Sequence, residues 1–147
     1  MLVMLVMTSA WYDTPADSRL GQTAPALNAL DGDSVCSLGQ FKGQYVLVSF
    51  WSSTDPESRL TNRAYDRLLE GRDDIVLMSV NLDDSNGVFE QIVEIDALRN
   101  GVQCHVNVDR RDEVVKRWRL GTGNKAFMVD PQGKIVAVNP EQPLTMV

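Results

Sequence analysis

Two stretches of the chain are almost continuously apolar. Tyr45 to Trp51 is interrupted only by Ser49, and Ile75 to Leu82 repeats the same character further along the chain. Such runs are typical of strands that are covered on both faces of a sheet. The segment between them, Pro56 to Glu70, has a helical pattern. We therefore predict two adjacent, parallel, central strands that are joined by a right-handed helical crossover.

Apolar residues at helical spacing predict three helices, over Pro56 to Glu70, Asn86 to Leu98 and Asp112 to Leu120. Gly71 is the expected stop of the first helix, and Asn100-Gly101 that of the second. The apolar positions of the three helices are, in chain order, Leu60, Ala64 and Leu68; Phe89, Ile92, Val93 and Ala97; and Val114, Val115 and Trp118.

Turn residues predict a hairpin near each end of the pattern. Asp31-Gly32-Asp33 separates Ala26 to Leu30 from Ser34 to Ser37, and Asp-Gly suits a tight hairpin turn. Near the C-terminus, Asp130-Pro131-Gln132-Gly133 separates two short apolar runs, with proline second and glycine fourth in the turn. Together with a short extended segment over 102–108, these elements predict an α/β fold. It has a central mixed sheet, helices on both faces and an N-terminal β-hairpin.

Composition favours one globular domain. The chain has 147 residues, of which 44% are hydrophobic and 23% charged, and its formal charge is −6. This length supports one hydrophobic core, and the acidic balance without a dense basic run makes nucleic acid an unfavoured partner. We expect a domain over 21–147, preceded over 1–20 by an apolar segment and a linker.

The apolar run Met1 to Met7, followed by Thr8-Ser9-Ala10, resembles a shortened signal peptide. It is well below the roughly 18 residues that a membrane-spanning helix needs, so no membrane span is expected. The alternative is an apolar segment that packs on the domain. The first interpretation indicates a periplasmic or cell-envelope location, and the second leaves a cytoplasmic one open.

Few residues offer metal or nucleophile chemistry. Cys36 and Cys104 lie far apart, which fits either one disulfide or two buried thiols, and zinc would need a Cys/His cluster. His105 follows Cys104 on an extended segment, so their side chains should point to opposite faces. Asp83 and Asp84, with the nearby Asn81 and Asn86, are interpreted as a polar loop. No catalytic residue, metal or cofactor is therefore assigned.

Several segments in this order resemble the TlpA/ResA branch of the thioredoxin superfamily, which is related to the AhpC/TSA proteins. The resemblance runs from about Gly21 to Ala137 and implies a fold that, in the family, supports thiol-disulfide exchange. The segments are Gly21-Gln-Thr-Ala-Pro25, the first hairpin, Leu38-Gly-Gln-Phe-Lys-Gly43, Val46-Leu-Val-Ser-Phe-Trp51 and Phe127-Met-Val-Asp-Pro-Gln-Gly-Lys-Ile135.

The chain departs from the family where the chemistry occurs. The family's Cys-x-x-Cys is matched by Asp55-Pro56-Glu57-Ser58, with Asp55 and Ser58 at the two cysteine positions and Arg59 retained. The family's cis-proline is matched by Asn124, so the preceding peptide should be trans. Thiol-disulfide exchange needs an attacking thiolate and a resolving thiol, which carboxylate and hydroxyl cannot replace.

The resemblance therefore implies a redox-inactive binding module that takes a polypeptide or small ligand in the former active-site groove. A purely structural interpretation is that Asp55 caps the helix that begins at Pro56. One rival is an oxidoreductase or peroxidase that uses a relocated Cys36/Cys104 pair, and another is an assembly domain with a vestigial groove. The groove residues are Trp51, Ser52, Ser53, Asp55, Pro56, Glu57, Ser58 and Asn124.

Overall fold

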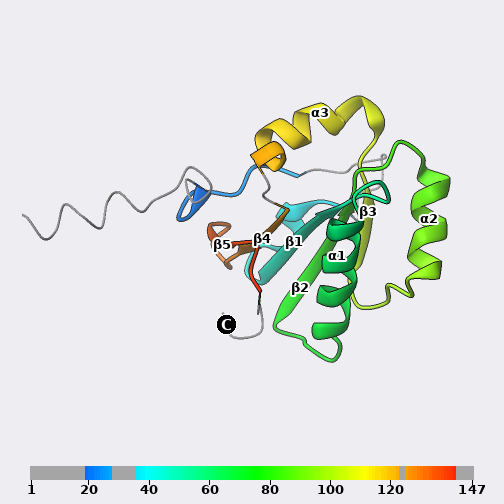
Figure 1. The fold of residues 1–147 in the computed structure, drawn as a ribbon. Coiled ribbons are helices and arrows are strands. Elements are labelled where there is room, and N and C mark those ends of the chain that lie inside the picture. The colour runs from blue at the N-terminus through cyan, green and yellow to red at the C-terminus, as the bar shows by residue number, and fades with distance from the viewer. Residues whose placement is uncertain (1–18, 28–35, 123–124, 142–147) are drawn as a thin grey trace, which may run out of the picture.

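A mixed sheet forms the centre of the molecule. The computed structural model describes residues 19–27, 36–122 and 125–141, and within these ranges five strands pair in the order β3-β2-β1-β4-β5 (Figure 1). β1, β2 and β3 are parallel, whereas β4 is antiparallel to β1 and β5 to β4. The strands are β1 (Tyr45–Trp51), β2 (Ile75–Asn81), β3 (Val102–His105), β4 (Ala126–Val129) and β5 (Ile135–Val138).

The two central strands confirm the prediction from the apolar runs. β1 pairs with β2 in parallel, in a register that begins at Tyr45 with Ile75 and ends at Trp51 with Asn81. Alternate residues of β1 enter different parts of the core. Val48 packs in one cluster and Leu47 in another, and both are fully buried. A strand with two buried faces cannot alternate apolar and polar residues, which explains the continuous run in the sequence.

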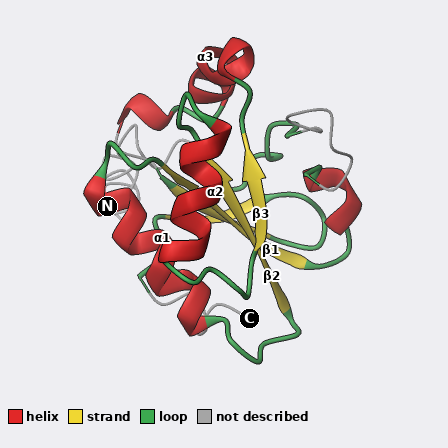
Figure 2. Ribbon diagram, turned by 90° about the vertical axis from the view of Figure 1, so that its right-hand side faces the viewer, coloured by secondary structure: helices red, strands yellow, loops and turns green. Residues whose placement is uncertain are grey.

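Helices cover both faces of the sheet, as predicted. α1 (Pro56–Leu68) and α2 (Asn86–Ile95) lie together on one face (Figure 2). Tyr65 of α1 packs against Leu47, and Phe89 of α2 packs against Trp51 on the same face of β1. α3 (Val108–Arg117) covers the other face, where Trp118 at its end contacts Phe50 at 5.2 Å between ring centroids. Val114 and Trp118 are core residues, as expected.

The apolar residues whose spacing predicted α1 face outward rather than into the core. Leu60 is 64% exposed and Leu68 43% exposed, and Ala64 is exposed as well. The helix instead buries Tyr65 together with polar residues. Among these, the Asp66 carboxylate accepts hydrogen bonds from the backbone N–H groups of residues 99–101, at 3.0–3.1 Å. The buried face of α1 can therefore be polar, because the loop over residues 99–101 supplies hydrogen-bond donors to Asp66.

Several helix boundaries were also wrong. α1 ends at Leu68 rather than Glu70, and α3 ends at Arg117 rather than Leu120. α2 ends at Ile95 rather than Leu98, because Asp96 turns inward to pair with Arg59 and Ala97 adopts a left-handed conformation with φ of 51°. α3 begins at Val108 rather than Asp112. Its N-cap is Asn107, whose side chain accepts a hydrogen bond from the Asp109 N–H. Polar residues that satisfy backbone or buried groups set the end of α2 and the start of α3.

The C-terminal hairpin forms as predicted, and the N-terminal one falls largely outside the described residues. At the former, the Gly133 N–H donates to the Asp130 carbonyl at 2.9 Å, and the Asp130 side chain accepts from two further amides. Residues 28–35 and 1–18 are outside the described ranges, so the Asp-Gly turn and the apolar N-terminal segment are too. No helix in the described ranges is long and apolar enough to cross a membrane.

Cys36 and Cys104 form a disulfide, which settles the pairing that the sequence left open. Their Cα atoms lie 5.6 Å apart, and the bond joins the segment before the 3-10 helix η3 (Leu38–Phe41) to β3 at the sheet edge. The two residues are only 6% and 1% exposed. His105 points to the other face of β3, as expected, where its ring stacks on Phe89.

Candidate functional site

The site lies where β1 ends and α1 begins, and its first component is the helix cap. The Asp55 carboxylate accepts a hydrogen bond from the Ser58 N–H at 3.3 Å, which confirms Asp55 as the N-cap. The Ser58 hydroxyl donates to the Asp55 carbonyl at 2.8 Å and accepts from the Ser52 N–H at 3.2 Å. Asp55 and Ser58 therefore link the first turn of α1 to the end of β1.

Lys125 lies opposite this cap and pairs with two acidic side chains. Its amine is 3.1 Å from the Asp55 carboxylate and 3.6 Å from that of Glu57. Partial burial raises the pKa of Asp55, but hydrogen bonds from Lys125 and Ser58 outweigh burial and hold it below its ordinary value. The hydrogen bond with Asp55 raises the pKa of Lys125. The site therefore holds a charged pair at neutral pH, at the position that the resemblance matches to a cysteine.

A buried carboxylate, Asp83, fixes the turn between β1 and α1. It accepts hydrogen bonds from the hydroxyls of Ser52 and Ser53, at 2.7 Å and 3.0 Å, and from the Ser53 N–H at 2.9 Å. Asn81 donates a further bond at 2.9 Å. Burial raises the pKa of Asp83, yet these bonds together lower it below the usual value. The Ser52 and Ser53 hydroxyls thus hold the turn in place.

The structure brings some predicted groove residues together and separates others. Trp51, Ser52, Asp55 and Ser58 line one hollow of about 210 Å³. Its other walls come from the ends of β2 and α3 and from η4 (Leu120–Thr122), and they include Leu82, Val115 and Leu120. The Trp51 indole is itself buried and donates to the Ser79 hydroxyl at 2.9 Å.

The remaining predicted residues lie around this hollow or outside the description. Ser53 faces a neighbouring hollow beside α2, and Glu57 faces a larger one beside α1. Pro56 is exposed at the first position of α1. Asn124 lies outside the described residues, so its predicted trans peptide stays a prediction. The sequence did not point to Lys125, although Lys125 directly follows Asn124.

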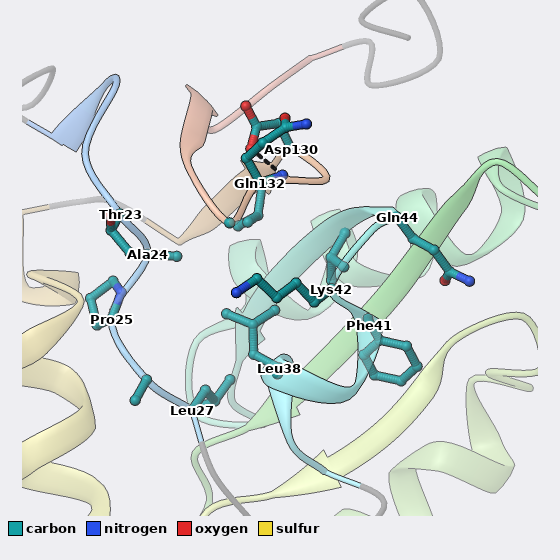
Figure 3. A pocket seen from close by; sticks show the side chains of 15 residues that line it. Thr23, Ala24, Pro25, Leu27, Leu38, Phe41, Lys42, Gln44, Asp130 and Gln132 are labelled. Carbon is teal, nitrogen blue, oxygen red and sulfur yellow. Dashed lines mark hydrogen bonds between the residues drawn. The ribbon is translucent and has the colours of Figure 1, made fainter.

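A separate hollow of about 210 Å³ lies at the opposite end of β1 (Figure 3). Its lining is mostly apolar and includes Pro25, Leu38 and Phe41, with Lys42 reaching across it. The Asp130 carboxylate at its rim accepts a hydrogen bond from the Gln132 N–H at 3.0 Å, so it is engaged within its own turn. The polar groups that the sequence pointed to are therefore at the other end of the sheet.

Arg59, which the family resemblance also retains, anchors α1 to the end of α2. Its guanidinium makes two hydrogen bonds of 2.7 Å to the buried Asp96 carboxylate. The hydrogen bond with Arg59 holds the pKa of Asp96 below its usual value. This ion pair has the bidentate geometry that makes arginine–carboxylate contacts strong.

Acidification should remove the stabilising contribution of this pair. Because the folded-state pKa of Asp96 is lowered, the contribution is complete above the unfolded-state value of about 3.9 and is lost as the pH falls through the lower folded-state value. We expect Asp96→Asn to be less stable than the unchanged protein by about 1–3 kcal/mol at pH 7. Urea unfolding should show the two proteins converging below about pH 4. A pH-independent difference would contradict this assignment.

Comparison with known proteins places the chain among thioredoxin-like proteins. No protein-family model matches it. It is 24% identical over 139 residues to sporulation thiol-disulfide oxidoreductase A of Bacillus subtilis, covering 90% of this chain and 82% of that protein. It is 22% identical over 146 residues to thiol-disulfide oxidoreductase ResA of Geobacillus thermodenitrificans, covering 91% of this chain and 80% of that protein.

Solved structures extend this similarity. A thioredoxin-like protein from Parabacteroides distasonis is 30% identical with a TM-score of 0.64, and the match covers 71% of this chain and 77% of that one. The thioredoxin domain of a thiol-disulfide oxidoreductase from Bacteroides vulgatus is 26% identical with a TM-score of 0.73. That match covers 82% of this chain and 88% of the domain.

Proposed function

This chain belongs to the TlpA/ResA-like family of thioredoxin-fold proteins, and we propose that within it the protein performs no thiol-disulfide exchange. We propose that it instead binds a polypeptide or small ligand at the former active site. The observation that carries this proposal is the Asp55–Ser58 cap, in which a carboxylate and a hydroxyl take the family's two sulfur positions. Exchange requires a thiolate that attacks a disulfide sulfur and a second thiol that resolves the product.

The same helix terminus favours negative charge, which in an active relative would stabilise a thiolate. Here the negative charge is the Asp55 carboxylate, and Lys125 neutralises it from across the site. A carboxylate so placed can attract a ligand but cannot exchange disulfides. The helix N-terminus that would hold a reactive sulfur in an active relative can therefore hold a fixed, polar binding surface in this protein.

The rival function, a relocated Cys36/Cys104 redox pair, has one observation in its favour, because the two sulfurs are bonded. Against it, both cysteines are buried, and Cys104 lies within β3 rather than at a helix N-terminus. Catalytic thiols are at least partly accessible and lie in surroundings that lower their pKa. We therefore assign this disulfide a structural role, and its presence supports an oxidising, extracytoplasmic location.

Alkylation under native conditions separates the two functions. The protein is treated briefly with a mild dithiol, then with N-ethylmaleimide, and the adducts are counted by mass spectrometry. We expect no adduct without denaturant and two adducts when the dithiol and denaturant are present together. Two adducts on protein whose circular dichroism remains native would instead favour the relocated redox pair. An active thioredoxin treated in parallel controls for the reductant.

A further inference from the structure

A second, larger hollow of about 600 Å³ adjoins the candidate site beside Lys125. Phe50, Ser58 and Lys125 line both hollows, so the two meet at these residues, and together they are called the divided groove. A volume of this size falls within the range of about 300–1,000 Å³ that is typical of ligand-binding clefts. The groove is therefore larger than the former active site alone.

The walls of the larger hollow are fixed before any ligand arrives. The Tyr65 hydroxyl of α1 donates to the Pro140 carbonyl at 2.6 Å, which ties the helix to the segment after β5. The Asn139 side chain accepts from the N–H groups of Lys125 and Ala126, at 2.8 Å and 3.1 Å. Burial and the nearby Glu141 raise the pKa of Tyr65 to about 12, so its donor proton is retained at neutral pH. A preformed groove reduces the entropy cost of binding.

Apolar side chains lie open along this groove. Ala64 and Leu68 of α1 face the larger hollow, and both are exposed. Leu60, one turn earlier on the same stripe, is the more exposed of the two leucines. The smaller hollow is lined by Leu82, Val115 and Leu120. A ligand that fits both parts must therefore carry apolar groups for each hollow.

The charges of the groove favour a basic ligand. Three carboxylates line it, from Asp55, Glu57 and Glu141, whereas Lys125 is the one cation among the described lining residues. Lys125 already pairs with Asp55 and Glu57, and the Glu57 side chain is 86% exposed. The described lining side chains therefore carry a formal charge of −2, in a protein whose total is −6. Opposite charges across an interface steer and orient a partner.

We propose that this divided groove binds an extended polypeptide in which a lysine or arginine meets the three carboxylates while flanking apolar side chains enter the two hollows. The inference rests on the binding function proposed above and names the chemistry of its partner. An extended chain suits a row of two hollows because alternate side chains point the same way and repeat about every 6.6–6.8 Å.

Fluorescence anisotropy can test this proposal with three labelled peptides. Each has leucine two positions before and two positions after a central residue, which is lysine, glutamine or glutamate. We expect the lysine peptide to bind at least about fivefold more tightly than the glutamate peptide, with glutamine intermediate. This ranking should weaken as the salt concentration rises, because exposed charges are screened.

Variants then locate the binding surface. Glu57→Gln with Glu141→Gln should weaken lysine-peptide binding at least about threefold. Glu90→Gln with Glu113→Gln makes the same change in net charge on α2 and α3 and should have no effect. Ala64→Trp should block the larger hollow without changing the charge. Circular dichroism and thermal unfolding confirm that each variant is folded.

The possible failures are distinguishable. Equal binding of all three peptides, lost in Ala64→Trp, would overturn the basic partner and leave the binding function standing. Equal weakening by the two glutamate double variants would reduce the preference to net charge and overturn the assignment to the groove. Absence of binding by every peptide would overturn this inference and the peptide form of the proposed function. The absence of redox activity would still be judged by the thiol measurement.

Discussion

Cys104→Ser should lower the free energy of unfolding by roughly 2–4 kcal/mol. The Cys36–Cys104 bond joins residues 68 positions apart, and a loop of that length corresponds to about 4 kcal/mol in the chain-entropy treatment. The substitution also places a hydroxyl at a site that is 1% exposed. Urea unfolding under non-reducing conditions measures the difference.

A double variant provides the matched control. Because each single substitution removes the same bond, Cys36→Ser, Cys104→Ser and their combination should lose similar amounts of stability rather than additive ones. Reduction of the unchanged protein should produce a comparable loss. Single losses below about 0.5 kcal/mol would contradict a stabilising disulfide.

Asp83→Ala should cost about 2–4 kcal/mol of stability. The substitution removes the acceptor of four donor groups, one of which belongs to Asn81, a fully buried residue. Buried donors that lose their acceptor cost about 1–3 kcal/mol each, offset where the serine hydroxyls can turn to water. The turn that carries Ser52 and Ser53 should loosen, and amide hydrogen exchange should quicken there.

The neighbouring acidic residue is the matched control for this prediction. Asp84 is adjacent in sequence, its side chain is 73% exposed, and its ion pair with Arg111 lies at the surface. Asp84→Ala should therefore cost less than about 1 kcal/mol. Equal losses for the two variants in thermal or urea unfolding would mean that the buried hydrogen bonds of Asp83 do not hold the turn.

The sequence predicted those parts of the fold whose cause is local. The central strands follow from their apolar runs, and the Asp55 cap follows from a residue type that accepts backbone hydrogen bonds at a helix start. The packing face of α1 was not predictable in this way, because its cause is not local. Asp66 is buried because amides of residues 99–101 reach it, and no spacing of apolar residues within α1 can indicate such partners.

The candidate site was predictable only in its local half. Asp55 and Ser58 were identified from one short segment. Lys125 lies near them only because β4, which it precedes, pairs with β1 in the sheet. The pairing of Cys36 with Cys104 could not be decided from the sequence for the same reason. A disulfide requires Cα atoms within about 7 Å of each other, and it is the fold that brings these two to 5.6 Å.

We propose that the N-terminus of α1, with Asp55 and Ser58, performs no thiol-disulfide exchange. Insulin reduction by dithiothreitol measures this most directly, with an active thioredoxin as positive control. We expect the unchanged protein to accelerate insulin precipitation no more than dithiothreitol alone, and Cys36→Ser and Cys104→Ser to leave that result unchanged. Turnover above background that either substitution abolishes would overturn the redox-inactive assignment and place the redox chemistry on the Cys36–Cys104 pair.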